Sequence, residues 1–479
     1  METASENNHH IVTTVAEIPG TARLIRLNPE TDRFKIYVLV GVPHPETVAM
    51  LQALYSRSPK SITERIDALT PEGAAKFMEQ FYAGYGHNSI ADCCSVEFFF
   101  EGVPMQVAKQ LQRDPRYNGQ EASTRYMDFS DAVAINSHDL PDGSRIQARW
   151  LDFYHRAQDR LKAHLRQQFP AHQDENPKAY ERAINARCFD VLRGFLPLGM
   201  PTNVSWSTSL RLAKDHLTLL SQSPDLDTRL VATSALNGLV QLLPGTFKKG
   251  ARQEKLAWLQ ARMARQDVQT QFREESFAEL LHIDQLFVNG LETINVPPSE
   301  RALFLERPPF TELDLDTNFW GRIAAEFLLD YGSFRDLQRH RALDIPVPVL
   351  GVDLGFHPWY LDQLPPELRE EALQLIAEQT EAIRALSDNR NVRQPYIAMG
   401  FRVPVLIGGP LHGWVYMIEL RSRTDVHPTL RAVVRRIGRR MRQALGHQLV
   451  IHVNEDVDDF SRRRADATFF DRKTGEAIE

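Results

Sequence analysis

One series of segments occurs twice, in the same order, along this 479-residue chain. The first copy contains an aromatic segment at 95–100, a helix ending in QLQR at 110–113, a Leu-Pro pair at 196–197, a tryptophan segment from 206 and a terminal helix closed by PGTF at 244–247. The second contains an aromatic segment at 310–320, a helix ending in DLQRHR at 336–341, a Val-Pro pair at 403–404, a tryptophan at 414 and a terminal helix over 429–446. Because the order matches while the identity is low, we interpret the chain as a diverged tandem duplication.

Length and composition fit two globular domains. The chain is about two to three times a typical domain, and 43% hydrophobic with 25% charged residues excludes a disordered or fibrous protein. Local patterns predict helices within 45–85, after Pro104, and over 148–170, 178–195, 206–220 and 228–243, with a strand at 95–100. The expected fold class is α/β in the α+β sense: two repeated units, each a small, mostly antiparallel sheet packed with long helices.

The repeat also predicts the domain boundaries. Residues 1–247 form the first domain, 315–453 the second and more diverged domain, and 454–479 a charged and loosely attached tail. Between the domains, 248–314 is expected to be a helical linker, because the stretch 246–270 is rich in Lys, Arg and Gln.

Several classes of protein are excluded by what the sequence lacks. Fifty-six basic and sixty-two acidic residues give a net charge of −6, too balanced to indicate nucleic acid as the main partner. The three cysteines, Cys93, Cys94 and Cys188, have no metal-binding or disulfide spacing, so we expect no metal and a reducing, cytoplasmic location. No signal peptide or membrane-length apolar run is visible. Neither a glycine-rich phosphate loop nor G-x-S-x-G occurs, which argues against Rossmann, P-loop and serine-hydrolase enzymes.

The densest group of polar residues lies between 110 and 125. Gln110 and Arg113 are three apart and share a helix face. Glu121, Ser123 and Arg125 follow, and the last two point the same way if the backbone is extended. Arginine offers a planar fork of donors that suits a phosphate or a nucleobase edge, so the group could bind a phosphorylated pyrimidine. The alternative is that Glu121 and Arg125 pair on a solvated loop.

Three further groups contain histidine. Arg339-His340-Arg341 ends a predicted helix and could grip a pyrophosphate or lie beside a flavin, although cations at a helix C-terminus also suit the helix dipole without a ligand. Gly86-His87-Asn88-Ser89 is turn-like, and Arg423 and His427 lie four apart at a predicted helix start. Both of these have a structural or simply exposed role as the alternative.

The run RDPRYNGQEASTRY at 113–126 resembles the R-H-R-x-x-S-x-N-E-x-S-x-R-Y signature of flavin-dependent thymidylate synthases. The matching residues are Arg113, Glu121, Ser123, Arg125 and Tyr126, with Gln110 at a further family position. Upstream GHNSIADCCSVEFFFEG, and downstream RGFLPLG from residue 193, WSTSLRLAKDHL from 206 and the closing PGTF, are similar to family segments in the same order. The resemblance covers most of 35–247.

The second half keeps other parts of the family pattern. Arg339-His340-Arg341 is the intact R-H-R, which Asp114 and Pro115 interrupt in the first half, and Arg423 with His427 matches a later R-x-x-x-H pair. Nothing like Q-E-x-S-x-R-Y follows this R-H-R, and Gly400 stands in place of the arginine at 193. Since the family's sites are shared between subunits of a homotetramer, the resemblance implies composite sites in a homodimer that forms a pseudo-tetramer with fewer than four competent sites.

The resemblance implies reductive C5 methylation of dUMP, with reduced FAD as hydride donor, methylenetetrahydrofolate as one-carbon donor and NADPH as reductant. The residues implied to bind nucleotide are Gln110, Arg113, Glu121, Ser123, Arg125, Arg193 and Arg423, of which Ser123 and Arg125 act at the reacting base, Ser123 as a binder and not a nucleophile. The residues implied to contact FAD are His87, Ser89, Arg211, Arg339, His340, Arg341 and His427. The alternatives are C5 modification of another pyrimidine nucleotide and a non-catalytic nucleotide-binding or scaffold protein.

Overall fold

The computed structural model describes residues 12–18, 22–41, 44–55, 70–173, 175–278, 286–457, 460, 469–470 and 477–478. The chain divides into two compact units, one made of residues 1–122 and 201–265 (unit 1) and the other of 123–200 and 266–479 (unit 2). This division differs from the boundaries expected at 247 and 315, because the segment 123–200 packs with residues of the second half instead of with the strands that precede it.

Unit 1 is a five-stranded sheet with short helices. Its strands are β1 (Thr13–Ile18), β2 (Ala22–Arg26), β3 (Lys35–Gly41), β4 (Ser95–Pro104) and β5 (Pro201–Ser209). Its helices and turns are α1 (Pro45–Tyr55), α2 (Pro71–Phe77), the π-helix η3 (Met78–Gly84), the 3-10 helix η4 (Asn88–Asp92), α3 (Met105–Leu111), α6 (Leu210–Leu220), α7 (Leu226–Leu242), α8 (Pro244–Phe247) and the first part of α9 (Gln253–Ala278).

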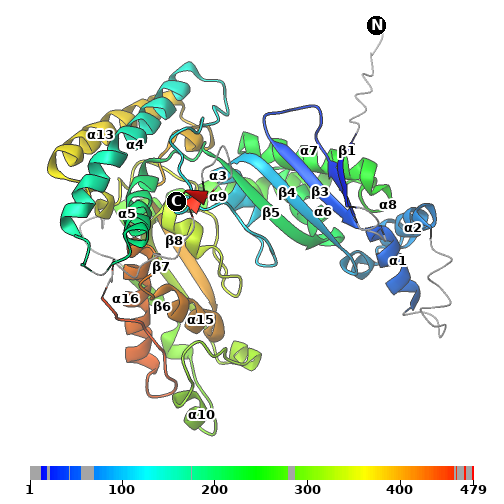
Figure 1. Cartoon of the computed structure of the whole chain (residues 1–479). Coiled ribbons are helices and arrows are strands. Elements are labelled where there is room, and N and C mark those ends of the chain that lie inside the picture. Colours follow the sequence, from blue (N-terminus) through cyan, green and yellow to red (C-terminus); the bar gives the residue numbers. More distant parts are fainter. Residues whose placement is uncertain are drawn as a thin grey trace. The chain divides into compact units, whose positions relative to one another are not determined.

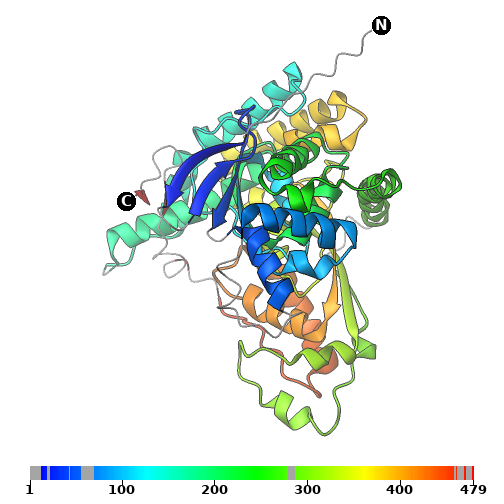
Figure 2. The same cartoon turned by 90° about the vertical axis from the view of Figure 1, so that its right-hand side faces the viewer.

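The sheet of unit 1 is antiparallel throughout, with strand order β1-β2-β3-β4-β5. Figure 2 shows β1, β2 and β3 side by side in dark blue. Side chains alternate between buried and more exposed positions along β3, β4 and β5, as expected for a sheet with one face against a core. On the buried face Phe98 stacks on Trp206, with ring centroids 5.4 Å apart. Helices α6 and α7 contribute to this core through Leu217 and Leu239 (Figure 1).

Unit 2 is built from long helices and a three-stranded antiparallel sheet of order β6-β7-β8. Its strands are β6 (Leu286–Asn289), β7 (Arg322–Asp330), β8 (Arg402–Pro410), and the short pair β9 (Phe469–Phe470) and β10 (Ala477–Ile478). Its helices and 3-10 turns are α4 (Pro141–Gln168), α5 (Pro177–Leu192), η5 (Arg193–Phe195), η6 (Leu291–Thr293), α10 (Arg301–Leu305), η7 (Leu315–Phe319), α11 (Tyr331–Leu337), α12 (Pro358–Asp362), α13 (Pro366–Leu386), α14 (Arg390–Arg393), η8 (Gln394–Tyr396), α15 (Leu411–Arg421) and α16 (Pro428–Leu445).

Two equivalent segments of unit 2 pair with each other by reciprocal hydrogen bonds. The Gly400 N–H donates to the Gly194 carbonyl (2.7 Å), and the Gly199 N–H donates to the Pro395 carbonyl (2.8 Å). Inside this pair, Met399 N–H donates to Leu196 O (2.9 Å) and Leu198 N–H to Ile397 O (3.0 Å). Within each of these two pairs of hydrogen bonds, the donor of one bond and the acceptor of the other come from matching positions of the two segments. This is the pattern of a local two-fold contact.

The order of elements around these turns is also the same in both halves. The sequence β4, α3, η5, β5, α6, α7 corresponds to β7, α11, η8, β8, α15, α16. Helices α3 and α11 each have seven residues, β5 and β8 nine, and α6 and α15 eleven. By this correspondence the counterpart of Arg193 is Gln394, the first residue of η8, and not Gly400 as expected from the sequence.

The fold class is as predicted: a mixed helix–strand protein with antiparallel sheets and more helix than strand. The strand at 95–100, the helix that begins at Pro71 and the long helices α4, α5 and α7 are confirmed. One local prediction, the helix over 206–220, was wrong at its start. Residues 206–209 belong to β5, because Trp206 follows the alternating burial of that strand, and the helix begins only after Ser209 caps the N–H of Leu212. The aromatic segment 310–320 contains the turn η7, and the strand that follows starts at Arg322. The pair Val403-Pro404 lies within β8.

The segments expected as linker and tail have more structure than the sequence indicated. Residues 248–314 contain α9 and α10 but also β6, which joins the sheet of unit 2. The first residues of the tail pack on α16: Arg435 Nη2 donates to Asn454 Oδ1 (3.2 Å), and Arg439 pairs with Glu455 (2.5 Å). Among the described residues no helix is long and apolar enough to cross a membrane, and no three His, Cys, Asp or Glu side chains form a metal-binding group.

Gly119 is needed where the loop after α3 lies against β5. The Ser207 N–H donates to Asn118 O (2.7 Å) and the Ser205 N–H donates to Gln120 O (2.9 Å), so the loop forms a short extra edge of the sheet. A Cβ on Gly119 would collide with the carbonyl oxygen of Ser205. We therefore expect Gly119→Ala to destabilise the protein by about 1–3 kcal/mol, measured by urea unfolding.

Gly250→Ala is the matched control in unit 1, because a Cβ there meets no atom within 4 Å. Its free energy of unfolding should change by no more than about 0.5 kcal/mol. Equal effects of the two substitutions would mean that the loop does not lie against β5 as described.

Candidate functional site

The residues singled out from the sequence are divided between the two units. Unit 1 holds His87, Ser89, Gln110, Arg113, Glu121 and Arg211. Unit 2 holds Ser123, Arg125, Arg193, Arg339, His340, Arg341, Arg423 and His427. The boundary falls between Ala122 and Ser123, so the motif that resembles the nucleotide-binding signature contributes to both units.

Glu121 is held in a buried ion pair with Lys109 in unit 1. Lys109 Nζ lies 2.6 Å from Glu121 Oε2, and neither side chain is more than 1% exposed. Gln112 bridges the pair, because its Nε2 donates to Glu121 Oε2 (3.0 Å) while its Oε1 accepts from Lys109 (2.8 Å). The alternative of a solvated Glu121–Arg125 pair is therefore wrong. No motif pointed to Lys109, which lies on α3 among buried apolar residues.

Arg113 and Gln110 also face inward in unit 1. Arg113 Nη1 donates to Gln110 Oε1 (3.4 Å) and to Met263 Sδ (2.9 Å). Burial lowers the pKa of Arg113 to about 10, and the neighbouring charge of Arg262 acts in the same direction. The carbonyl of Gln110 accepts from His216 Nε2 (3.2 Å), and burial lowers the pKa of that histidine to about 4. His216 therefore serves as a neutral donor that fixes the end of α3.

The predicted turn 86–89 lies beside the start of α6. Gly86 has φ +76°, which favours glycine, and His87 and Ser89 are exposed. Arg211 Nε donates to Asp92 Oδ1 (2.8 Å), the last residue of the 3-10 helix η4 that carries Ser89. Asp92 thus joins η4, the element that carries Ser89, to Arg211 at the start of α6.

Arg125 and Arg193 each pair with an aspartate in unit 2. Arg125 donates from Nε to Asp190 Oδ1 (2.6 Å) and from Nη2 to Asp190 Oδ2 (3.0 Å), a bidentate contact. Arg193 Nη1 donates to Asp336 Oδ2 (3.2 Å), and its Nη2 donates to Ser333 Oγ (3.0 Å). Both guanidinium groups are therefore positioned by carboxylates before any ligand is considered.

Ser123 and Arg125 lie in a turn and not in an extended strand. The Tyr126 N–H donates to the Ser123 carbonyl (3.3 Å), and the Arg125 N–H donates to Ser123 Oγ (3.2 Å). The backbone is therefore not extended here, and Ser123 and Arg125 do not share a face in the way an extended backbone would give. The serine hydroxyl accepts a nearby N–H, which favours a turn.

His427 adjoins the arginine–aspartate pairs, whereas Arg423 is exposed. His427 Nε2 donates to the carbonyl of Asp190 (3.1 Å), and its Nδ1 accepts from Thr429 Oγ1 (2.9 Å). Burial holds the pKa of His427 well below its ordinary value, and Arg193 adds to the effect. Arg423 pairs with Asp425 at 3.2 Å. Both residues precede α16, so the expected helix start begins only at Pro428.

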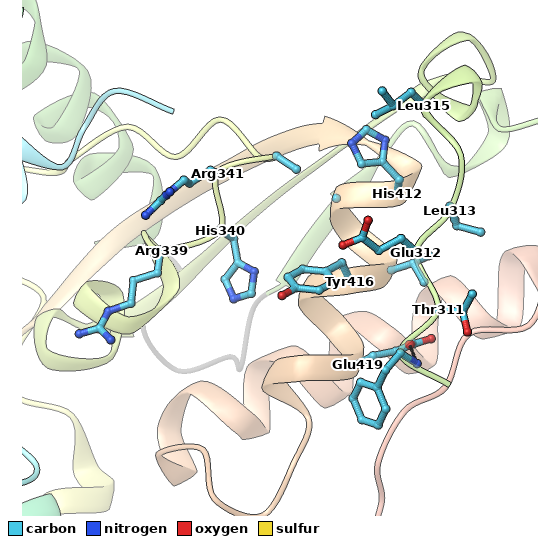
Figure 3. Close-up of a pocket in the computed structure, with 14 residues that line it drawn as sticks. Thr311, Glu312, Leu313, Leu315, Arg339, His340, Arg341, His412, Tyr416 and Glu419 are labelled. Carbon is cyan, nitrogen blue, oxygen red and sulfur yellow. Dashed lines mark hydrogen bonds between the residues drawn. The ribbon is translucent and has the colours of Figure 1, made fainter. Parts of the chain in front are cut away.

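The predicted R-H-R lines a cavity of about 450 Å³ in unit 2 (Figure 3). The walls come from residues 310–313 and 315, the loop 339–342, and one side of α15 that includes His412, Tyr416 and Glu419. The R-H-R follows α11, which ends at Leu337, and does not end it. Arg339 and Arg341 are exposed, whereas His340 is only 5% exposed and its ring lies 6.1 Å from that of Tyr416.

Sequence reasoning missed several residues that organise these sites. Tyr416 and the aspartates Asp190 and Asp336 carried no motif. For Asp336 a signal was present, because DLQR at 336–339 has an aspartate where QLQR at 110–113 has Gln110. In these two matched segments the first has an amide where the second has a carboxylate.

Replacing Lys109 tests whether Glu121 is structural. We expect Lys109→Met to lower the free energy of unfolding by about 3–5 kcal/mol, because it leaves the Glu121 carboxylate buried without a cation. Urea unfolding of the variant is the measurement. Lys255→Met, which breaks the exposed pair with Asp215, should cost less than about 1 kcal/mol. A Lys109 variant as stable as the Lys255 variant would contradict a buried pair.

Comparison with known proteins finds a family match over part of the chain and relatives that align with most of their own length. Residues 39–245 match the family described as thymidylate synthase complementing protein. A UPF0159 protein of Thermoplasma acidophilum is 23% identical over 463 residues, covering 81% of this chain and 91% of the relative. A UPF0159 protein of Chlamydia muridarum is 22% identical, covering 75% and 77%. A flavin-dependent thymidylate synthase of Clostridium tetani is 24% identical over 218 residues, covering 45% of this chain and 85% of the relative.

Among solved structures, a UMP/dUMP methylase from Streptomyces cacaoi bound with 5-Br dUMP aligns with 45% of this chain and 93% of its own, at 13% identity and a TM-score of 0.30. That score is too low for any feature of one protein to be transferred to the other. The similarity to the thymidylate synthase complementing protein family lies in residues 39–245, which include the motif at 113–126.

Proposed function

We propose that the protein is a flavin-dependent, thymidylate-synthase-like enzyme that methylates the C5 position of dUMP reductively, with FAD, methylenetetrahydrofolate and NADPH. The observation that carries the proposal is the R-H-R triplet lining a cavity of about 450 Å³ in a chain whose residues 39–245 match the family. The proposed flavin contacts are those implied by the resemblance: His87, Ser89, Arg211, Arg339, His340, Arg341 and His427.

The residues of the cavity fit a flavin. Its volume is within the range of pockets that hold small organic ligands, about 300–1,000 Å³. Leu313, Val415 and the half-exposed ring of Tyr416 offer apolar surface for a planar ring system. Arg339 and Arg341 lie together on one side in Figure 3 and offer cations for a pyrophosphate. A bound reduced flavin would supply the hydride, while the protein orients it and excludes competing reactions.

For the nucleotide we propose Gln110, Arg113, Glu121, Ser123, Arg125, Arg193 and Arg423. In unit 2, Arg125 can hold a phosphate or a base carbonyl with its guanidinium fork, and Ser123 can orient the base. A phosphate that approaches Arg125 or Arg193 must compete with Asp190 or Asp336 for their N–H groups. These ion pairs hold the arginine side chains in place. They also make the binding of a doubly charged phosphate less favourable than it would be at unpaired arginines.

The alternatives to turnover of dUMP are C5 modification of another pyrimidine nucleotide and nucleotide binding without turnover. The loss of R-H-R in the first half, where Asp114 and Pro115 follow Arg113, supports these alternatives. The scaffold alternative predicts neither flavin binding nor a modified nucleotide.

We also propose that the chain is a diverged tandem duplication and forms a homodimer that acts as a pseudo-tetramer. The reciprocal hydrogen bonds between residues 194–199 and 395–400 support the duplication, because two copies of one segment meet there as equivalents. The equal lengths of β5 and β8 and of α6 and α15 support it as well.

Flavin retention is the first test. The purified protein, incubated with FAD and desalted, should keep a flavin absorption spectrum. Arg339→Gln should weaken FAD binding by about ten- to a hundredfold, because it removes a charge-assisted contact. Arg322→Gln removes an exposed arginine that pairs with Asp344 outside the cavity and should leave FAD affinity unchanged. A protein that remains colourless after loading would contradict the proposed cofactor.

The substrate is tested by mass spectrometry of nucleotides. With FAD, NADPH and methylenetetrahydrofolate present, dUMP should gain the mass of one methylene group, whereas UMP, dCMP and deoxyuridine should not. Arg125→Lys should raise the KM for dUMP by about tenfold, because lysine cannot form the bidentate contact. A mass change in another nucleotide would select the alternative substrate, and no change despite bound flavin would select the non-catalytic role.

A further inference from the structure

His340 is the buried member of the R-H-R triplet, whereas Arg339 and Arg341 are exposed. It is 5% exposed, with Tyr416 next to its ring in the middle of Figure 3. The ring lines the cavity. A ligand in the cavity would therefore contact a histidine whose protonation state is set by the surrounding protein residues.

Arg421, the last residue of α15, determines that state. Arg421 Nε donates to His340 Nε2 at 2.7 Å, and Arg421 Nη2 donates to the carbonyl of Asp336 at 3.1 Å. A guanidinium keeps its protons at any physiological pH, so His340 Nε2 must be the acceptor. In a neutral imidazole the other nitrogen, Nδ1, then carries the proton.

Burial and the neighbouring charge of Arg421 keep His340 neutral. Arg339 and Arg341 flank it in the chain, Arg421 and Glu419 come from α15, and the ring of Tyr416 lies 6.1 Å from its own. Glu419 is already paired with Arg307, so it does not offset the arginines. Burial, and next the charge of Arg421, hold the pKa of His340 well below its ordinary value. Nδ1 has no hydrogen-bond partner among the described residues.

We infer that Arg421 is a positioning residue that fixes His340 as the neutral Nδ1–H tautomer, so that His340 acts as a hydrogen-bond donor to the occupant of the cavity. The occupant must then present an acceptor to it, such as a carbonyl oxygen or an unprotonated nitrogen of a planar heteroaromatic ring. A phosphate would be recognised at Arg339 and Arg341 instead, where the charge is. That the occupant is a flavin rests on the proposed function, whereas the state of His340 does not.

A chain of contacts links this histidine to the arginine that we propose binds nucleotide. Arg193 donates to the Asp336 carboxylate, Arg421 donates to the Asp336 carbonyl, and Arg421 also donates to His340. Asp336 thus holds Arg193 with its side chain and Arg421 with its main chain. The orientation of His340 consequently depends on a residue outside the cavity.

The tautomer can be measured directly by NMR of the imidazole nitrogens in the full-length protein without flavin. In protein labelled with ¹⁵N-histidine and compared with His340→Gln for assignment, His340 should show a protonated Nδ1 and an unprotonated Nε2 that do not change between pH 6 and 9. Arg421→Met should give a mixture of tautomers and raise the pKa of His340 toward its ordinary value. Arg439→Met, which removes an exposed arginine of α16 paired with Glu455, should leave the His340 signals unchanged.

A second pair of variants tests the donor against the ligand and does not depend on Arg421. The side-chain N–H of asparagine reaches the position of histidine Nδ1, whereas that of glutamine reaches the position of Nε2. His340→Asn should therefore keep the Kd for FAD within about threefold of the wild type, and His340→Gln should weaken it about tenfold.

The outcomes separate this inference from the proposed function. A protonated Nε2, or titration of His340 near its ordinary pKa in the wild type, would overturn the inference even if FAD binds. Equal FAD affinity of the Asn and Gln variants would overturn it as well. The predicted tautomer in a protein that binds no FAD would support the inference about His340 and reject the flavin.

Discussion

Asp336 holds two arginines of unit 2, Arg193 and Arg421, in position. Its carboxylate accepts from Arg193 and its carbonyl from Arg421. Burial alone would raise the pKa of Asp336, but the guanidinium groups of Arg193, Arg339, Arg125 and Arg421 hold it well below its ordinary value. Without this negative charge the buried guanidinium of Arg193 would lose its carboxylate partner, and removing one member of a buried ion pair costs about 3–5 kcal/mol. Asp336 therefore pairs with Arg193, which we propose for nucleotide, and also orients the arginine that contacts His340.

Much of the fold could be predicted because the signals are local. Alternating burial along β4 matches its aromatic sequence, and Pro71 begins α2 after Thr70 caps it. Predictions of which residue a charged side chain pairs with were less successful. Glu121 finds Lys109, and Arg125 finds Asp190 sixty-five residues away. No spacing rule indicates such pairs, because tertiary packing decides which carboxylate reaches which cation. The segment 123–126 is different, because a local contact, from the Arg125 N–H to Ser123 Oγ, makes it a turn and not the extended backbone that would align Ser123 and Arg125.

The two halves have the same order of elements around the paired turns, while the polar residues at matching positions differ. Gln110 corresponds to Asp336, and Arg193 corresponds to Gln394 at the start of the equivalent turn. Buried apolar positions such as Val204 in β5 and Val405 in β8 are retained as strand core. Packing thus constrains the scaffold of each half, whereas the residues available for chemistry differ between them. This is the pattern expected when the elements stay in place and the site residues specialise.

The reciprocal pairing of residues 194–199 with 395–400 joins two segments of a single polypeptide. In a symmetric dimer of identical chains, any substitution at such a contact would appear on both sides at once, so only changes tolerated twice could persist. Here Gly194 lies against Tyr360 and Gly400 against Phe356, and each can mutate without its counterpart. The covalent connection therefore frees the contact from the requirement of self-complementarity. Asymmetric sites can evolve around it one residue at a time.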